Sequence, residues 1–185
     1  MYTDADGNKH YYTDQTDNYL QKNYQLLLNH SFSTAWNLNV ALHYTKGDGY
    51  YEEYKPGSSL VEYGLKPFNP DGTETNESDL VRQKKMDNKF GGGVFSLNYT
   101  GNRLTASLGG GLNQYRGNNF GKVTWVKNYI GNLSPEHEYY RNKSKKTDGN
   151  IYLKANYDLT STLSAYADLQ YRHIDYTIDG VNDKY

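Results

Sequence analysis

The stretch "YQLLLNHSFSTAWNLNVALHY", residues 24–44, contains two runs in which almost every second residue is apolar. Side chains of a β-strand alternate between its two faces, so this pattern predicts two strands, each with one apolar and one polar face. A short turn at "STA" would pair Tyr24 with Tyr44, Leu26 with Leu42, Leu28 with Val40, and Phe32 with Trp36. Aromatic residues then stand at both ends of the apolar stripe, and aliphatic residues fill its middle.

The same alternation predicts two further hairpins. Their apolar faces carry Phe95, Leu97, Tyr99, Leu104, Ala106 and Leu108, then Ile151, Leu153, Ala155, Tyr157, Leu163, Ala165, Ala167, Leu169 and Tyr171. The opposite face is mostly Asn, Ser, Thr and Gln, with Leu27 and Val94 as exceptions. Because a Tyr or Trp ring is apolar with a polar tip, rings at both ends of an aliphatic stripe are typical of a membrane interface.

The connections between the predicted strands alternate in length. Short turns close the three hairpins, whereas two long loops, about 47–87 and 117–147, separate one hairpin from the next. In an up-and-down sheet, connections that alternate in this way lie at opposite ends, as do the short periplasmic turns and long extracellular loops of outer-membrane barrels. We therefore expect an all-β fold: an antiparallel up-and-down meander of about six strands that forms part of a large transmembrane β-barrel.

Composition narrows the function classes. A net charge of −1 gives no electrostatic reason to expect nucleic acid, and the absence of Cys excludes a disulfide framework or a thiolate metal site. We find no apolar run long enough for a transmembrane helix and no signal peptide at the N-terminus.

A soluble sheet with one solvated face remains the alternative to a barrel, because alternation alone fits both. The sequence offers no amphipathic helix to cover the apolar face of such a sheet, whereas lipid needs no packing partner. The smallest common membrane barrels have about eight strands, so six cannot close. We therefore expect the 185-residue chain to be a piece of a larger barrel.

Three stretches carry a family resemblance: "DNYLQKNYQLLLNHSFSTAWNLNVALHYTKGDGYYEEYK", "GLNQYRGNNFGKVTW" and "KKTDGNIYLKANYDLTSTLSAYADLQYRHIDY". They resemble the barrel of TonB-dependent outer-membrane receptors of the Bacteroidetes type. The resemblance covers residues 1–185 and implies that the chain is a mid-barrel segment, about a quarter of a plugged barrel of about 22 strands. The plug domain, the TonB box and the terminal strand of such a receptor are absent from it. It also implies uptake of a scarce nutrient (siderophore, haem, cobalamin or glycan) across the bacterial outer membrane, with TonB, the receptor's own plug and a surface lipoprotein as partners.

Aromatic residues gather in the two predicted loops, where binding residues are commonly held by a rigid scaffold. The expected ligand-contact residues are Tyr50, Tyr51, Tyr54, Trp125, Tyr139 and Tyr140. Rings interleaved with Asn, Asp and Lys suit sugars and siderophores, and they equally suit loops that pack on each other.

Other motifs indicate structure rather than chemistry. "GNNFGK" (117–122) has glycines too close together for a phosphate loop. "EHE" (136–138) points its side chains in alternate directions, which argues against a metal site. "DADGN" (4–8) lacks the later ligands of a calcium loop and is typical of a turn. Lys154 and Asp168 should face each other across the third hairpin.

With no paired nucleophile and base in the sequence, we expect a protein that is not an enzyme and needs no cofactor or metal. The second hypothesis is a soluble or surface-attached carbohydrate-binding or adhesin β-domain.

Overall fold

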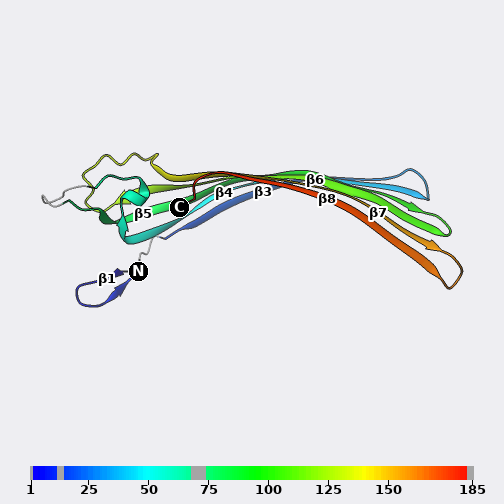
Figure 1. Cartoon of the computed structure of the whole chain (residues 1–185), viewed down its shortest axis with the longest axis horizontal. Helices are drawn as coiled ribbons and strands as arrows, with labels where there is room; N and C mark the ends of the chain where they lie inside the picture. The colour runs from blue at the N-terminus through cyan, green and yellow to red at the C-terminus, as the bar shows by residue number, and fades with distance from the viewer. Residues whose placement is uncertain (1, 12–14, 68–73, 183–185) are drawn as a thin grey trace.

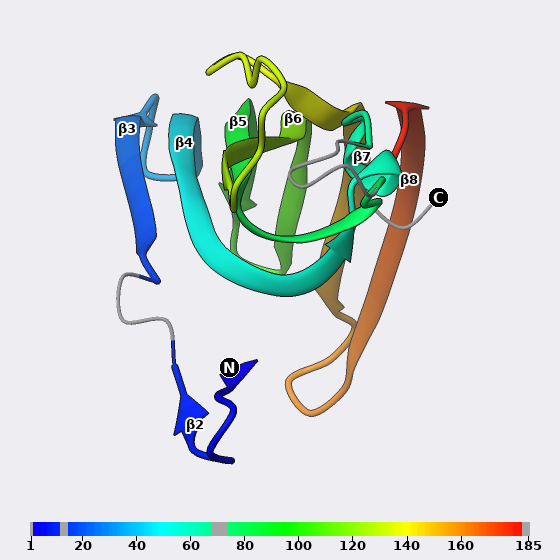
Figure 2. The ribbon, with the colours of Figure 1, turned by 90° about the vertical axis from the view of Figure 1, so that its left-hand side faces the viewer.

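A computed structural model describes residues 2–11, 15–67 and 74–182. Six long strands form one antiparallel sheet in which every strand pairs with its neighbour in sequence. They are β3 (Asp17–Ser31), β4 (Trp36–Ser59), β5 (Glu77–Thr100), β6 (Leu104–Val126), β7 (Glu138–Asp158) and β8 (Ser164–Gly180). The sheet curls into half a barrel, with β3 and β8 on its two flanks (Figure 2). The predicted fold class, an all-β antiparallel up-and-down meander of six strands, is confirmed.

The register of the hairpins also agrees with the prediction. Tyr24 is opposite Tyr44, Leu26 opposite Leu42, and Leu28 opposite Val40. The amide of Phe32 donates to the carbonyl of Trp36 at 3.0 Å, and the Trp36 ring lies 4.9 Å from that of Tyr99 on the next strand. Lys154 is opposite Asp168, with 3.9 Å between Nζ and Oδ2. The stripe of apolar residues therefore continues from strand to strand as one band, which we call the apolar band.

The opposite face carries a connected network of polar side chains. Asn39 donates to Ser96 at 3.3 Å, Asn98 donates to Ser96 at 3.2 Å, and Ser107 donates to Asn98 at 2.8 Å. His43 Nε2 of β4 reaches across the whole of β5 to lie 2.8 Å from Asn113 Oδ1 of β6. Side chains from strands that are not neighbours meet where a curled sheet is concave. The polar face is therefore the inner face of the half-barrel, and the apolar band lies on its outer face.

The strands extend well beyond the segments that show clear alternation. β4 and β5 each have 24 residues, about 80 Å at ~3.3 Å per residue, whereas a membrane strand needs ~9–11 residues. The expected loops, about 47–87 and 117–147, are therefore corrected: most of their residues lie in paired strands, and the connections run over residues 60–76 and 127–137. In these extensions both faces are rich in polar residues, so the alternation is lost although the backbone pairing continues.

The connections collect at opposite ends of the sheet, as the alternating lengths predicted. Figure 1 shows the three short turns at one end and the connections that follow β4 and β6 at the other. We call the second end the loop end. Within the described residues, β3 and β8 each pair with a single strand, and every residue of both is exposed.

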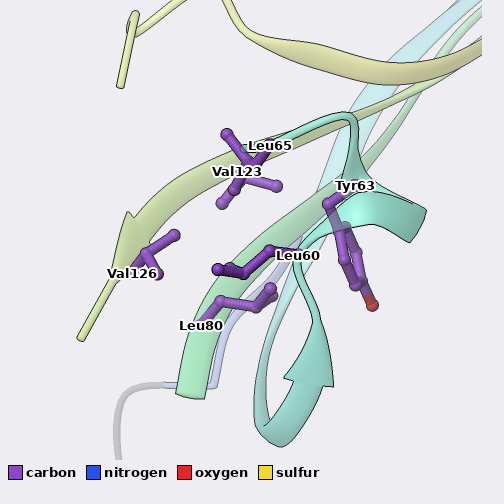
Figure 3. Close-up of a cluster of buried hydrophobic side chains, with 6 residues drawn as sticks. All are labelled: Leu60, Tyr63, Leu65, Leu80, Val123 and Val126. Carbon is purple, nitrogen blue, oxygen red and sulfur yellow. The ribbon is translucent and has the colours of Figure 1, made fainter. Parts of the chain in front are cut away.

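A small buried core lies at the loop end. A 3-10 helix, η1 (Val61–Tyr63), follows β4. The residues in and around this helix pack against β5 and β6. The cluster consists of Leu60, Tyr63, Leu65, Leu80, Val123 and Val126, each at most 6% exposed (Figure 3). Gly64, at φ 66°, adopts the left-handed conformation that ends this turn.

The remaining described structure is a short hairpin of β1 (Tyr2–Thr3) and β2 (Lys9–His10). The predicted "DADGN" turn closes it: Asp4 Oδ1 accepts hydrogen bonds from the amides of Asp6 and Asn8, and Gly7 has a φ of 84°. Across the described ranges, none of the helices has the length and apolar character needed to cross a membrane.

Candidate functional site

A hollow of about 380 Å³ opens on the inner face toward the loop end. Its wall is built from the five strands β4 to β8 and the chain after β8, and consists of Tyr51, Lys84, Lys85, Met86, Asn119, Tyr140, Asn142, Ile178, Gly180 and Asn182. We call it the mouth hollow. The hollow lies on the same face as the polar network, further along the same strands toward the loop end.

Aromatic and amide groups dominate the chemistry of the mouth hollow. Tyr51 lies beneath the Lys84 ammonium, with 6.0 Å between Nζ and the ring centre. Asn119 donates to Asn142 Oδ1 at 3.2 Å, across β6 and β7. Gly121 follows Asn119 on the inner face and is covered by the rings of Tyr139 and Tyr140. The hollow therefore offers ring faces, amide donors and acceptors, and a cation to a small polar ligand.

The structure brings only some of the predicted ligand-contact residues together. Tyr51 and Tyr140 both line the mouth hollow. Tyr139 packs in the small core, with its ring 4.7 Å from that of Tyr63, and contributes to a second hollow.

The other three predicted residues lie on the outer face. Tyr50 is six residues beyond Tyr44 on β4 and therefore lies on the same face as the apolar band. The centre of its ring lies 5.1 Å from the Lys85 ammonium. Tyr54 stacks on Trp125 at 6.5 Å and donates a hydrogen bond to Asp79 at 2.6 Å. These three rings are thus separated from the mouth hollow by the thickness of the sheet.

The second hollow, about 530 Å³, lies beside η1 and is more strongly charged. Arg82 pairs with Glu53 on the adjacent strand and donates to the Tyr63 hydroxyl at 3.1 Å. Burial acts to lower the pKa of Arg82, but hydrogen bonding to Glu53 and the nearby tyrosines outweighs it, so the pKa is raised. Arg82 is therefore a fixed cation in the wall of this hollow.

Asp79 anchors the outer side of the loop end. Burial tends to raise the pKa of this carboxyl, but hydrogen bonds from Tyr54 and the Gly57 amide, together with the charge of Lys127, lower it overall. The carboxylate thus holds the β4 bulge around Gly57 against β5.

The three residues of "EHE" have separate protein partners. Glu136 pairs with Lys122 at 2.5 Å, His137 Nε2 lies 2.6 Å from the Tyr63 carbonyl, and Glu138 accepts from Arg141 at 2.8 Å. Hydrogen bonding to Arg141 is the main reason that the pKa of Glu138 is lowered. Over the described part of the chain, no cluster of three metal-ligating side chains is found. "GNNFGK", which we expected in a loop, lies within β6.

Sequence reasoning missed Arg82, Glu53, Lys84 and the Asn119–Asn142 pair. The hydrophobic pattern does not mark these residues, because they lie where both faces of the strands are polar. Comparison of the chain with models of known protein families and with curated protein sequences found no match.

Proposed function

We propose that this chain forms part of the barrel of an outer-membrane receptor of the TonB-dependent type. The observation that carries the proposal is the apolar band on the outer face. Its side chains project away from the sheet with nothing packed over them in the described structure: Leu26 is 66% exposed, Leu108 40% and Leu169 70%. Aliphatic side chains flanked by aromatic rings on the outside of a curled sheet match the lipid-facing surface of a membrane barrel.

The half-barrel shape supports the same proposal. An open edge presents unpaired backbone donors and acceptors, which cannot be left exposed to lipid. In the barrel that we propose, β3 and β8 pair with further strands and the sheet closes. The polar network around Asn39, Ser96 and Asn98 then faces the interior, where the plug of such a receptor packs.

The loop end forms part of the extracellular mouth in this proposal. There, the mouth hollow contributes to the binding of a scarce nutrient through the rings of Tyr51 and Tyr140 and the amides of Asn119 and Asn142. This chemistry suits a siderophore, haem, cobalamin or glycan. The role is transport without catalysis, with energy supplied through TonB and, for a glycan, with a surface lipoprotein as partner.

Behaviour in detergent tests the proposal. The protein should partition with the outer membrane, need detergent to stay in solution, and migrate differently on a gel before and after heating. A protein that stays monomeric in buffer without detergent would instead favour the second candidate, a surface-attached carbohydrate-binding or adhesin β-domain. The mouth hollow favours that candidate too, because stacked rings and amides also suit sugars on a soluble scaffold.

A further inference from the structure

Five cations lie directly opposite one another across five strands. The register pairs Lys22 with Lys46, Lys46 with Lys89, Lys89 with Arg116, and Arg116 with Lys145. All five are exposed. Each is an even number of residues from an apolar-band residue on its own strand, so all five lie on the face that carries the apolar band. We call this set the basic row.

The basic row is electrostatically unfavourable by itself, because like charges directly opposite in a sheet destabilise it. Four carboxylates lie on the same face next to the row. Asp48 and Asp87 are two residues from Lys46 and Lys89 along β4 and β5, and Asp175 and Asp179 of β8 are two residues from Thr177, the partner of Lys145. Within the described ranges, none of the five cations forms an ion pair, whereas other cations do, such as Arg82 with Glu53 and Arg172 with Asp148. The row is therefore a concentrated positive charge available to an external anion.

The position of the row relative to the apolar band indicates which anion. Lys46 lies two residues beyond Tyr44 on β4, and Arg116 lies four beyond Leu112 on β6. These steps correspond to about 7–13 Å along a strand. With the strands tilted by ~35–45°, that distance reaches the polar headgroup layer, which is ~5–8 Å thick on each side of the hydrocarbon core.

The opposite edge of the band lacks such a row. The three short-turn regions, residues 30–38, 97–106 and 155–166, contain one Lys or Arg, namely Arg103. Its guanidinium donates to the carbonyl of Leu159 at 3.0 Å. Positive charge is thus concentrated at one edge of the band, which fits a bilayer whose anionic groups are concentrated in one leaflet.

Resting on the proposed membrane barrel, we propose that the basic row binds the phosphate groups of an anionic lipid in the leaflet at the loop end. Ammonium and guanidinium groups bind phosphate through charge-assisted hydrogen bonds. Five of them in register form a line that can bridge phosphates on neighbouring lipid headgroups. The lipid offsets the repulsion within the row and fixes the height of the barrel in the membrane.

The test is a titration of the purified protein, in dodecyl maltoside micelles, with the bis-phosphorylated glycolipid lipid A, followed by native mass spectrometry. The variant Lys46→Gln/Lys89→Gln/Arg116→Gln should bind lipid A about 100-fold more weakly, since each cation near an anionic surface contributes about fivefold. A matched pair sharpens the test: Lys145→Gln should weaken binding about fivefold, whereas Lys146→Gln, on the inner face, should leave it unchanged.

Two further arms identify the source of the phosphate. Dephosphorylated lipid A should bind at least 100-fold more weakly, and inorganic phosphate at 10 mM should not displace lipid A. Equal losses in Lys145→Gln and Lys146→Gln, or full displacement by inorganic phosphate, would overturn the lipid assignment while leaving the barrel intact. A protein that needs no detergent at all would overturn the barrel proposal itself.

Discussion

Arginine at position 108 gives the sharpest stability test of the outer face. Leu108 lies four residues from Leu104 and four from Leu112, near the centre of the apolar band, and is directly opposite Leu97 and Leu153. A cation there would stand about 13 Å along the strand from either edge of the band. Arginine on the lipid face near the bilayer midplane costs about 2–4 kcal/mol, so Leu108→Arg should lose that much unfolding free energy.

The adjacent residue is the matched control. Ser107 faces the polar network and donates to Asn98 at 2.8 Å, so Ser107→Arg removes one neutral hydrogen bond, a loss of about 1 kcal/mol. Both variants are unfolded with guanidinium in phospholipid vesicles and followed by tryptophan fluorescence. Equal losses, or a greater loss for Ser107→Arg, would refute the assignment of the two faces. A soluble sheet with a solvated outer face would tolerate Leu108→Arg.

Three further predictions concern the loop end and the inner face. Leu60→Ala should destabilise the loop-end core by about 2–5 kcal/mol and speed proteolysis in residues 60–76, whereas Val61→Ala, at a side chain that is 59% exposed, should not. Because the folded-state pKa of Asp79 is lowered, its stabilisation is complete above its unfolded value of 3.8 and is lost as the pH falls through the folded value. The fluorescence of Trp125 should therefore change in acid below that pH, and Asp79→Asn should remove this acid transition. The Lys154–Asp168 pair is half exposed, so a double-mutant cycle should give a coupling of less than about 1 kcal/mol.

The registers within hairpins could be predicted because short turns fix them. Once "STA" closes the first hairpin, Leu26 must meet Leu42, and a turn around 159–161 likewise puts Lys154 beside Asp168. The apolar faces followed from the same alternation. Period-two patterning and turn length therefore account for the three hairpins and for which face of each is apolar.

The registers between hairpins could not be predicted in this way. The connection between β4 and β5 is long, so nothing in the sequence specifies that Glu53 lies opposite Arg82. The mouth hollow depends on these registers, since Tyr51 and Tyr140 come from strands that are far apart in sequence. The basic row also depends on these registers. Two of its four register pairs, Lys46 with Lys89 and Arg116 with Lys145, join one hairpin to the next.

The strand ends were missed for a related reason. Alternation of apolar and polar residues indicates a strand only where one face of that strand is apolar. Beyond Lys46 and Arg116, polar and charged residues appear on both faces. Backbone hydrogen bonds need no such contrast, so the ladder continues to Ser59 and Val126. Tyr50 and Tyr51, adjacent in sequence and both expected to contact ligand, consequently lie on opposite faces.

The most direct test of lipid contact is a spin-label scan of β7. The chain has no Cys, so single cysteines at 151, 152, 153 and 154 can each be labelled with a nitroxide without removing native thiols. Lipid-soluble oxygen and a water-soluble nickel chelate then compete as relaxants in reconstituted vesicles. A lipid-facing apolar band predicts strict alternation, with oxygen reaching labels at Ile151 and Leu153 far better than those at Tyr152 and Lys154. Nickel access to 151 and 153 as great as oxygen access would place the apolar band in water and contradict the barrel.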